Sequence, residues 1–454
     1  MNVIKSFFNN IYAALRAHVM LVVTALVAIF NLAKAAIRAL ATGKGPFKAR
    51  LAALAPLPET PGDFFAVLRA FMPNLVLSKQ IKSYENSGTA IITRASDVIE
   101  VLDREADFAV VYEPKMRALT GGENFFLGMQ DTAQYQYDVA MMRLVMRRED
   151  VESIVAPLAR RKAEEFAGAY PTRIDLPQDL TTRVPAAIVS EYFGTPGPEE
   201  KDLVEWATAL FWWLFIDLEA DPEIERKALE AGRALCASID KTIAVRKASR
   251  KKKDDLVGRA LTFQASAPEF TDLSIRNNLV GMVIGAIPTI SKASVQALDQ
   301  LLNRPVALAG AQAAAQAGDE ALLGAYIFEA LRFNPINPVI YRRATRDTTI
   351  AASTLRARHI KKGMMVFAAN LSAMFDPLKV EDPEKFRADR PWGDYMLWGY
   401  GLHTCSGAYI NRAVIPAMLR PILARPNLRR AEGDAGRLSG GADPFPRHFV
   451  LESD

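Results

Sequence analysis

Residues 398–407 constrain this chain more than any other stretch. They read WGYGLHTCSG, so three glycines, one histidine and one of the chain's 2 cysteines lie within a single short segment. The residues that follow, Ala408–Leu419, have a helical pattern. A cysteine just ahead of a helix has its thiolate stabilised by backbone N–H groups and by the helix dipole. The segment therefore predicts an anionic sulfur placed to bind a cationic metal.

The glycines and the histidine of this segment suit a bound flat ligand. Gly401 permits a tight turn that a Cβ atom would obstruct. Gly407 lets a flat ligand approach the backbone closely. His403, two residues before Cys405, can donate a hydrogen bond to an acidic group at the ligand's edge. We therefore expect a cofactor site in this loop.

The rest of the chain is mostly helical in pattern. The expected helices are Asp150–Gly168, Pro198–Leu218, Asp221–Arg246, Leu279–Leu302, Ala307–Ala317 and Leu322–Phe333. The expected strands are Ala90–Thr93, Val339–Arg343, Thr348–Ala351 and Met364–Ala368. Leu279–Leu302 is long and largely apolar, so we expect it to be buried through the centre. The pattern predicts a mainly α fold with a small β-sheet, of the α+β class.

Charge is distributed unevenly along the chain. The formal net charge is +5, but residues 1–58 carry seven basic side chains and no acidic one. The remaining 396 residues carry 49 basic and 51 acidic groups. A nucleic-acid-binding face should lie in the folded body, which here is nearly neutral. The balance therefore argues against nucleic acid as a partner.

The N-terminal segment has the pattern of an amphipathic helix that runs into an apolar stretch, Val19–Phe30. That stretch is shorter than the roughly 18 apolar residues of a confident spanning helix. We expect an interfacial anchor that meets a membrane surface through residues 1–40. A tilted spanning helix, a cleaved targeting segment and a helix packed on the body are the alternatives. The turn-rich stretch 56–62 separates this leader, 1–55, from a single catalytic domain, 56–454.

A second charged feature lies inside the body. Arg246–Lys253 carries six basic residues in eight positions. A solvated loop explains such a run, and a docking patch for an acidic redox partner is the sharper interpretation. Two cysteines also exclude a disulfide scaffold and fit a reducing compartment.

The cysteine loop resembles the haem loop of the cytochrome P450 family, Phe-x-x-Gly-x-(Arg/His)-x-Cys-x-Gly. Gly401, His403, Cys405 and Gly407 match that pattern, and Trp398 stands at the leading Phe. The resemblance covers about residues 75–454. It implies a triangular, P450-like haem-thiolate fold and haem b (iron protoporphyrin IX) as cofactor.

Two further segments carry the resemblance at the expected distances. Glu329 and Arg332 match the family's Glu-x-x-Arg helix. The stretch 382–390 resembles the segment whose arginine completes a buried salt-bridge triad with that pair. Arg390 is the expected third member, and Arg387 is the alternative.

The resemblance also implies roles at the cofactor. Cys405 becomes the thiolate ligand of haem iron, and His403 contacts a haem propionate. Arg342 aligns with the family's other propionate-binding arginine, with Arg343 as the fallback. Trp398 is expected against the proximal side of the haem.

The central helix departs from the family pattern. Where the family usually has an acid followed by Thr, this chain has Pro288 and Thr289, after Ala286. Thr289 keeps the hydroxyl that would help to deliver protons to oxygen, whereas proline removes a backbone N–H and kinks a helix. The loss of the acid leaves Ser291 or ordered water to complete a proton relay.

A second departure concerns the helix near 131–148. The family usually has Trp/His-x-x-x-Arg there, with both residues on propionates, and no such pair aligns in this chain. Tyr135, Tyr137 and Arg143 are the candidates in its place.

Three functions follow from the resemblance. The first is an O2-dependent monooxygenase that acts on a small apolar or lipid-like substrate with electrons from a separate ferredoxin, flavodoxin or reductase. The second is a peroxygenase, isomerase or dehydratase that consumes a peroxide or lipid hydroperoxide directly. The third is an inactive haem-binding relative. The expected location is the cytoplasmic face, with membrane association through the leader.

Overall fold

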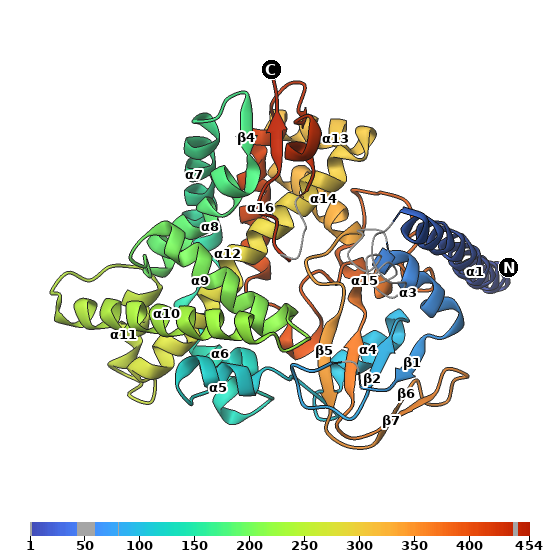
Figure 1. The fold of residues 1–454 in the computed structure, drawn as a ribbon, viewed down its shortest axis with the longest axis horizontal. Helices are drawn as coiled ribbons and strands as arrows, with labels where there is room; N and C mark the ends of the chain where they lie inside the picture. Colours follow the sequence, from blue (N-terminus) through green and yellow to red (C-terminus); the bar gives the residue numbers. More distant parts are fainter. Residues whose placement is uncertain (1, 43–59, 80, 439–443) are drawn as a thin grey trace. The chain divides into compact units, whose positions relative to one another are not determined.

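The computed structural model describes residues 2–42, 60–79, 81–438 and 444–454 (Figure 1). The described chain falls into two compact units. The first unit comprises residues 1–81, 85–109 and 332–404, and the second comprises 82–84, 110–331 and 405–454.

The first unit is built around a five-stranded sheet with the order β1-β2-β8-β5-β3. The strands are β1 (Asn74–Leu77), β2 (Thr89–Ile92), β3 (Phe108–Ala109), β5 (Ile340–Ala344) and β8 (Met365–Ala368). β2 and β8 run parallel, and the other neighbouring pairs are antiparallel. Helix α4 (Ala95–Asp103) packs its apolar face, including Val98 and Leu102, into the core under this sheet. A two-stranded ribbon, β6 (Thr348–Ile350) with β7 (Arg358–Ile360), belongs to the same unit.

Helix α1 (Asn2–Thr42) packs against α3 (Thr60–Phe71) within the first unit. A narrow stripe of α1, Leu21, Ala25 and Ala28, is buried in that contact. Most of the other large apolar side chains that the structure describes on α1 are exposed. The stretch Ile11–Ala41 is long and apolar enough to cross a membrane: an 18-residue segment within it has a mean hydropathy of 2.1, and 17% of that segment is buried. Within the expected leader, residues 2–42 form one continuous helix, whose described part has one packed and one exposed face.

The second unit is helical, and its central element is α12 (Asp272–Leu302), most of whose residues are buried. Around it lie α5 (Glu113–Thr120), α6 (Ala133–Val145), α7 (Ala156–Gly168), α8 (Arg183–Ile188), α9 (Glu200–Phe211), α10 (Pro222–Ala248), α11 (Leu256–Gln264), α13 (Pro305–Ala317) and α16 (Ala408–Leu423). A three-stranded sheet has the order β4 (Arg173–Asp175), β10 (Val450–Glu452), β9 (Arg429–Arg430). Helix α14 (Glu320–Phe333) crosses the boundary between the units.

The observed elements confirm the predicted class, mainly α with small sheets. Each expected helix is present, and α12 begins at Asp272 rather than Leu279. The reason is the Thr271 side chain, which accepts a hydrogen bond from the Ser274 backbone N–H and so caps the helix ahead of its apolar run. Asp150–Gly168 is not one regular α-helix, because it opens with a π-helical turn, Val151–Val155.

Candidate functional site

The predicted site residues are divided between the units. Ala286, Pro288, Thr289, Glu329, Cys405 and Gly407 belong to the second unit, and Arg332, Arg342, Arg343, Arg390, Trp398, Gly401 and His403 belong to the first.

Cys405 lies just ahead of α16, whose N-cap is Gly407. Cys405 is exposed as a residue, yet protein atoms around its thiol raise the pKa by desolvation, whereas backbone hydrogen bonds from Gly407 and Ala408 act to lower it. A thiol with a raised pKa stays protonated at neutral pH unless a cation takes the place of the proton. The donor set therefore fits a sulfur that ionises when it binds a metal.

The space beside the sulfur is open on the glycine side. A Cβ atom added to Gly407 would meet its nearest neighbour, the Sγ atom of Cys405, only at 3.8 Å. One helical turn after the cysteine, Tyr409 donates a hydrogen bond to the Met146 carbonyl at 3.1 Å. This bond ties the start of α16 to the end of α6.

In the first unit, the loop ahead of the cysteine makes the turn that the glycine pattern predicts. Gly401 has φ +72°, and a Cβ atom there would lie 2.9 Å from the Leu102 carbonyl oxygen. His403 ends the short 3-10 turn that Gly401 begins. Its Nε2 lies 3.1 Å from a carboxylate oxygen of Glu105, a partner that the sequence did not indicate. His403 thus already faces one acid within its own unit.

Arg342 and Arg343 point in different directions because neighbouring residues of β5 alternate between faces. Arg342 is 3% exposed and donates to the Tyr341 carbonyl. Arg343 is exposed and lies 4.0 Å from the carboxylate of Glu85. Of the two, Arg342 is the buried cation.

Arg332 and Arg390 come together in the first unit. Both guanidinium groups donate to the Lys385 carbonyl, at 3.2 and 2.7 Å. Arg390 also donates to two further carbonyls and its side chain is 1% exposed, whereas the half-buried Arg387 side chain pairs with the exposed Glu381 and Asp389. Glu329 is fully buried one turn before Arg332 on α14.

Trp398 lies against another tryptophan. Its ring stacks on Trp392 with centroids 5.4 Å apart and an interplanar angle of 25°, and Trp392 in turn contacts Tyr395. The indole is therefore held in place by neighbours within its own unit.

Helix α12 is buried along most of its length but opens at one place. Gly285 is exposed, and Ala286 and Thr289 are half-buried, between stretches of buried neighbours. A Cβ atom added to Gly285 would have nothing within 4 Å. The Thr289 hydroxyl donates to the Gly285 carbonyl, across the same open face. Two small residues and one hydroxyl thus share this face of the central helix.

Pro288 lies inside α12 and is buried. Because it has no N–H, the backbone bond to the residue four positions earlier is missing. Ser291, the alternative proton carrier, is 4% exposed, and its hydroxyl lies 2.8 Å from that of Thr181. Ser291 is therefore engaged away from the open face.

The three residues of α6 that were candidates for contact with the propionates differ in solvent exposure. Tyr135 is 5% exposed, Tyr137 is half-buried, and Arg143 is exposed. Desolvation and nearby carboxylates raise the pKa of Tyr137, so this phenol stays neutral. The described structure joins neither tyrosine with Arg143 in a pair.

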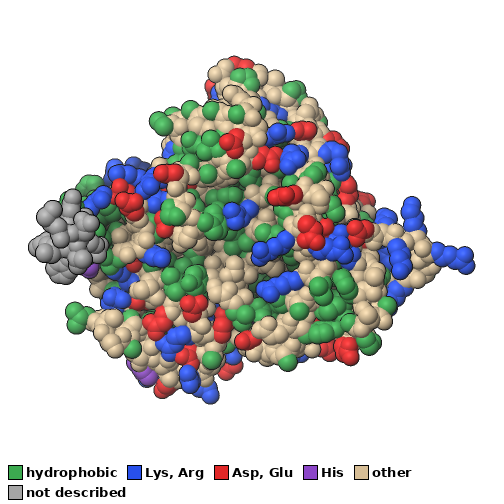
Figure 2. All heavy atoms as spheres, turned by 180° about the vertical axis from the view of Figure 1, so that it is seen from behind, with side chains coloured by type: hydrophobic (Ala, Val, Ile, Leu, Met, Phe, Trp, Pro, Cys, Tyr) green, Lys and Arg blue, Asp and Glu red, His purple; other side chains and the backbone are tan. Residues whose placement is uncertain are grey.

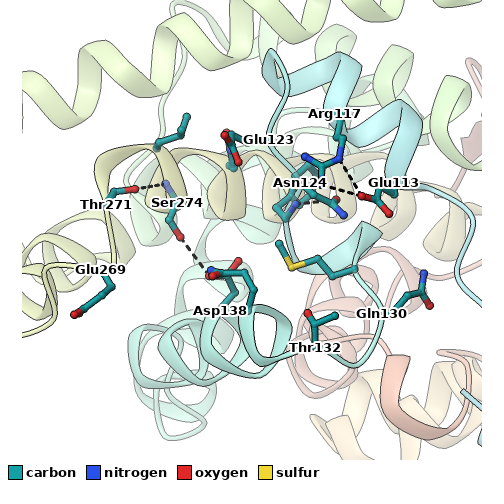
Figure 3. Close-up of a pocket in the computed structure, with 15 residues that line it drawn as sticks. Glu113, Arg117, Glu123, Asn124, Gln130, Thr132, Asp138, Glu269, Thr271 and Ser274 are labelled. Atoms are coloured by element: carbon teal, nitrogen blue, oxygen red, sulfur yellow. Dashed lines mark hydrogen bonds and ion pairs between the residues drawn. The ribbon is translucent and has the colours of Figure 1, made fainter. Parts of the chain in front are cut away.

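A polar cavity of about 450 Å³ lies in the second unit between α5, α6 and the start of α12 (Figure 3). Its lining includes the acids Glu113, Glu123, Asp138 and Glu269. Asp138 points toward Ser274, whose hydroxyl donates to it at 3.3 Å, and burial raises the pKa of this carboxyl. None of the predicted site residues lines this cavity, and Thr289 lies twelve residues beyond Asn277, about 18 Å along the helix.

The family described as Cytochrome P450 matches residues 83–426, which is most of the chain.

Curated relatives share about a quarter of their residues with the chain. The C-19 steroid 1alpha-hydroxylase of Sorangium cellulosum is 27% identical over 65% of this chain and 72% of its own length. The steroid C26-monooxygenase of Mycolicibacterium smegmatis is 27% identical over 57% and 61%. A bifunctional dioxygenase–epoxy alcohol synthase of Fusarium oxysporum is 23% identical over 74% of this chain and 29% of its own length. Several other bacterial relatives match over 56–64% of their length.

Solved structures share the fold at lower identity. P450BioI, in complex with acyl carrier protein ligated to hexadec-9Z-enoic acid, has a TM-score of 0.75 at 18% identity over 88% of this chain and 100% of its own. CYP109E1 from Bacillus megaterium, in complex with testosterone, has a TM-score of 0.70 at 17% identity over 87% and 99%.

Proposed function

Because this chain belongs to the cytochrome P450 family, whose cofactor is protoporphyrin IX haem iron, we propose that it is an O2-dependent monooxygenase of apolar, lipid-like substrates. The observation that carries the proposal is Cys405, held ahead of α16 with the backbone N–H groups of Gly407 and Ala408 on its sulfur. Iron bound to such a thiolate supplies the O–O cleavage chemistry. The residues around it must then hold the cofactor, exclude water and deliver protons.

Several side chains of the first unit have the right chemistry to hold the cofactor. Arg342 is a buried cation and His403 a ring donor, and both suit the carboxylates at a haem's edge. Trp398, fixed by its stacking on Trp392, offers an indole N–H for the proximal side. Glu105 lies 3.1 Å from His403 Nε2, so a propionate would have to share this ring with the acid.

The triad residues act as positioning residues in this proposal. Arg332 and Arg390 bind the backbone of the 381–385 loop from a buried position. Glu329, fully buried one turn before Arg332 on the same helix, is the acid that we propose for this triad, because buried guanidinium groups require a negative charge. The three residues fix the protein ahead of the cysteine loop and do no chemistry themselves.

Proton delivery falls to the open face of α12. Thr289 holds its hydroxyl there by donating to the Gly285 carbonyl, and Ala286 leaves room beside it. A hydroxyl in this position can pass a proton from water to a reacting oxygen atom.

The substrate class rests on chemistry and on the relatives. Three curated relatives are named for steroids, and two similar structures hold testosterone and an acyl carrier protein ligated to a fatty acid. The steroid and the fatty-acid chain are both large and apolar. We propose the same class, lipid-like molecules, for this chain.

The membrane contact is proposed from the exposed side chains of α1, and the redox partner from the electrons that the reaction needs. Apolar side chains such as Leu15, Val23, Leu26 and Phe30 are exposed on α1, which suits an interfacial anchor at the cytoplasmic face of a membrane. Monooxygenases of this family need redox partners such as ferredoxin, and we propose a separate ferredoxin, flavodoxin or reductase as the electron donor of this chain.

A second function is favoured by one specific observation. Pro288 occupies the position of the acid that normally serves the O2-dependent proton relay, and Ser291 is bonded to Thr181 instead. An enzyme that receives its oxygen atom already reduced, from a peroxide or lipid hydroperoxide, needs no such relay. One relative is named an epoxy alcohol synthase.

The test compares the two oxidants on purified protein. A reduced carbon-monoxide difference spectrum typical of a thiolate ligand is expected first, and Cys405→Ser should abolish it. With a panel of fatty acids and steroids, 18O from 18O2 should then appear in the product when NADPH, ferredoxin reductase and ferredoxin are supplied. Turnover with fatty-acid hydroperoxides, and none with O2 and the electron donors, would establish the second function instead. Absence of a haem spectrum would refute both.

A further inference from the structure

The loop between α10 and α11 presents cations that no acid neutralises. Arg250, Lys251, Lys252 and Lys253 are all exposed, and none has an ion pair in the described structure. Figure 2 shows Lys and Arg side chains gathered on the segment that projects at the right edge. The two cations that precede these four are used differently: Arg246 pairs with Asp255, and Lys247 pairs with Asp272.

The loop is built to hold those cations in place. The Arg246–Asp255 ion pair, at 2.5 Å, closes the base of the loop, and both side chains are mostly buried. Asp255 also caps α11 through the Gly258 N–H at 2.9 Å. A Cβ atom at Gly258 would lie 2.0 Å from the Lys253 carbonyl oxygen, so the loop backbone lies directly on the first turn of α11. The cations therefore extend from an anchored backbone, which lowers the entropy lost when they bind a partner.

A further cation joins the loop at a small cavity. Lys252, Lys253 and Arg147 line one hollow of about 260 Å³ together with Asp254 and Arg259. Asp254 is taken by Arg259, to which it is bonded at 2.5 Å. The same Arg259 binds Asp150 and the Val145 carbonyl. It therefore fastens α11 to the segment 145–150 at the end of α6, which carries Arg147.

The segment 145–150 also contacts α16, the helix that begins after Cys405. Arg148 is exposed and lies 5.8 Å from the centroid of the Tyr409 ring, on the first turn of α16. The exposed acid beside it is Glu149, which leaves an excess of positive charge on this face. All these residues belong to the second unit.

We propose that Arg250–Lys253, with Arg147 and Arg148, form a docking surface for an acidic electron-carrier protein. The inference rests on the proposed function, because only a reaction that consumes external electrons needs such a carrier. Acidic side chains of the partner enter the hollow between Arg147 and Lys252–Lys253. An anchored cationic surface of this kind speeds the encounter with an acidic partner in a salt-dependent way.

The test reverses three loop charges and compares them with a matched control. The variant is K251E/K252E/K253E, and the control is K201E/K227E/K241E, which makes the same change in net charge at exposed lysines of α9 and α10. The second-order rate of haem reduction by a reduced, acidic [2Fe–2S] ferredoxin is measured by stopped flow at low and high salt. The loop variant should lose roughly tenfold or more at low salt and most of its salt dependence, and the control should stay near the parent rate.

Chemical reduction separates the two proposals. With dithionite and carbon monoxide, the loop variant should give the parent spectrum, because its cofactor site is unchanged. Equal ferredoxin rates in all three proteins, or equal losses in variant and control, would overturn the docking surface while the spectrum still supports the proposed function. A loop variant that loses only its retention on duplex DNA would also overturn it. Failure of the parent spectrum would refute the proposed function itself.

Discussion

Arg390 and Arg387 differ by three positions in sequence and strongly in environment. Arg390 is buried and donates to the carbonyls of Glu381, Asp382 and Lys385 at 2.7–3.0 Å. Arg387 pairs with exposed carboxylates of Glu381 and Asp389. Each arginine suits the triad by sequence alone, whereas burial singles out Arg390.

Leucine at each position should show the difference. Arg390→Leu removes a buried charge-bearing donor and leaves three carbonyls without it, so it should lower the free energy of unfolding by about 3–5 kcal/mol. Arg387→Leu breaks only exposed pairs and should cost less than about 1 kcal/mol. Urea unfolding of both variants measures the two values. Similar losses would mean that Arg387 carries the structural role.

Lys115 on α5 is a buried cation that no role in the proposed chemistry explains. Its residue is 8% exposed, its Nζ donates to the Trp213 carbonyl, and the ring centroids of Tyr84 and Trp213 lie 4.8 and 5.2 Å away. Desolvation lowers its pKa from 10.5 to about 8, against the weaker opposing effect of Asp217 and Glu225. These contacts reduce the free-energy cost of burying the Lys115 ammonium group but do not cancel it.

The lowered pKa predicts a pH-dependent stability. Between pH 8 and 10.5 the unfolded chain binds more protons at Lys115 than the folded chain, so the parent protein gains stability from this group as pH rises. Lys115→Met should therefore be more stable than the parent at pH 7, by about 2–3 kcal/mol, with the advantage shrinking toward pH 10. Denaturant unfolding at several pH values measures this, with Lys241→Met, an exposed lysine, as control. A pH-independent difference would contradict the shift.

At the scale of elements, the sequence predicted the long periodic helices and four short strands, β2, β5, β6 and β8, but not the other strands. The apolar run after Leu279 predicts the central helix because burial on all sides demands it. Strands β1, β3, β4, β7, β9 and β10 were missed. They are two to four residues long, too short for a clear local alternation, and β3 and β4 also depend on partners far along the chain, β5 and β10.

The site shows the same division. The loop glycines and Cys405 carry local signals, since a positive φ at Gly401 and a sulfur ahead of a helix are properties of neighbouring residues. Glu105 carries none, because it meets His403 only through folding across almost three hundred residues. The same holds for Thr181, which engages Ser291 from another helix turn and removes it from the open face of α12. The sequence therefore predicts site residues from their neighbours in the chain, but not the residues from distant segments that contact them in the fold.

At the scale of the molecule, α1 is neither a free membrane-spanning helix nor a fully packed helix of the body. Its stripe of Leu21, Ala25 and Ala28 is buried against α3, and Arg16 pairs with Asp382 at 2.5 Å. The opposite face exposes Val19, Val23 and Phe30. A helix fastened along one side to its own unit suits a position in the plane of a membrane surface better than a free span.

The exposed face and the whole segment can be tested separately. V19E/V23E/F30E should abolish sedimentation with vesicles of anionic phospholipid and leave the melting temperature unchanged, because these side chains contribute to no packed core. The K201E/K227E/K241E protein controls for added negative charge and should still sediment. Deletion of residues 1–55 should also end sedimentation and keep the carbon-monoxide spectrum, with some loss of stability from the uncovered face of α3. If deletion instead abolishes the spectrum, α1 is part of the catalytic fold; if the glutamate variant still sediments, the membrane contact lies elsewhere.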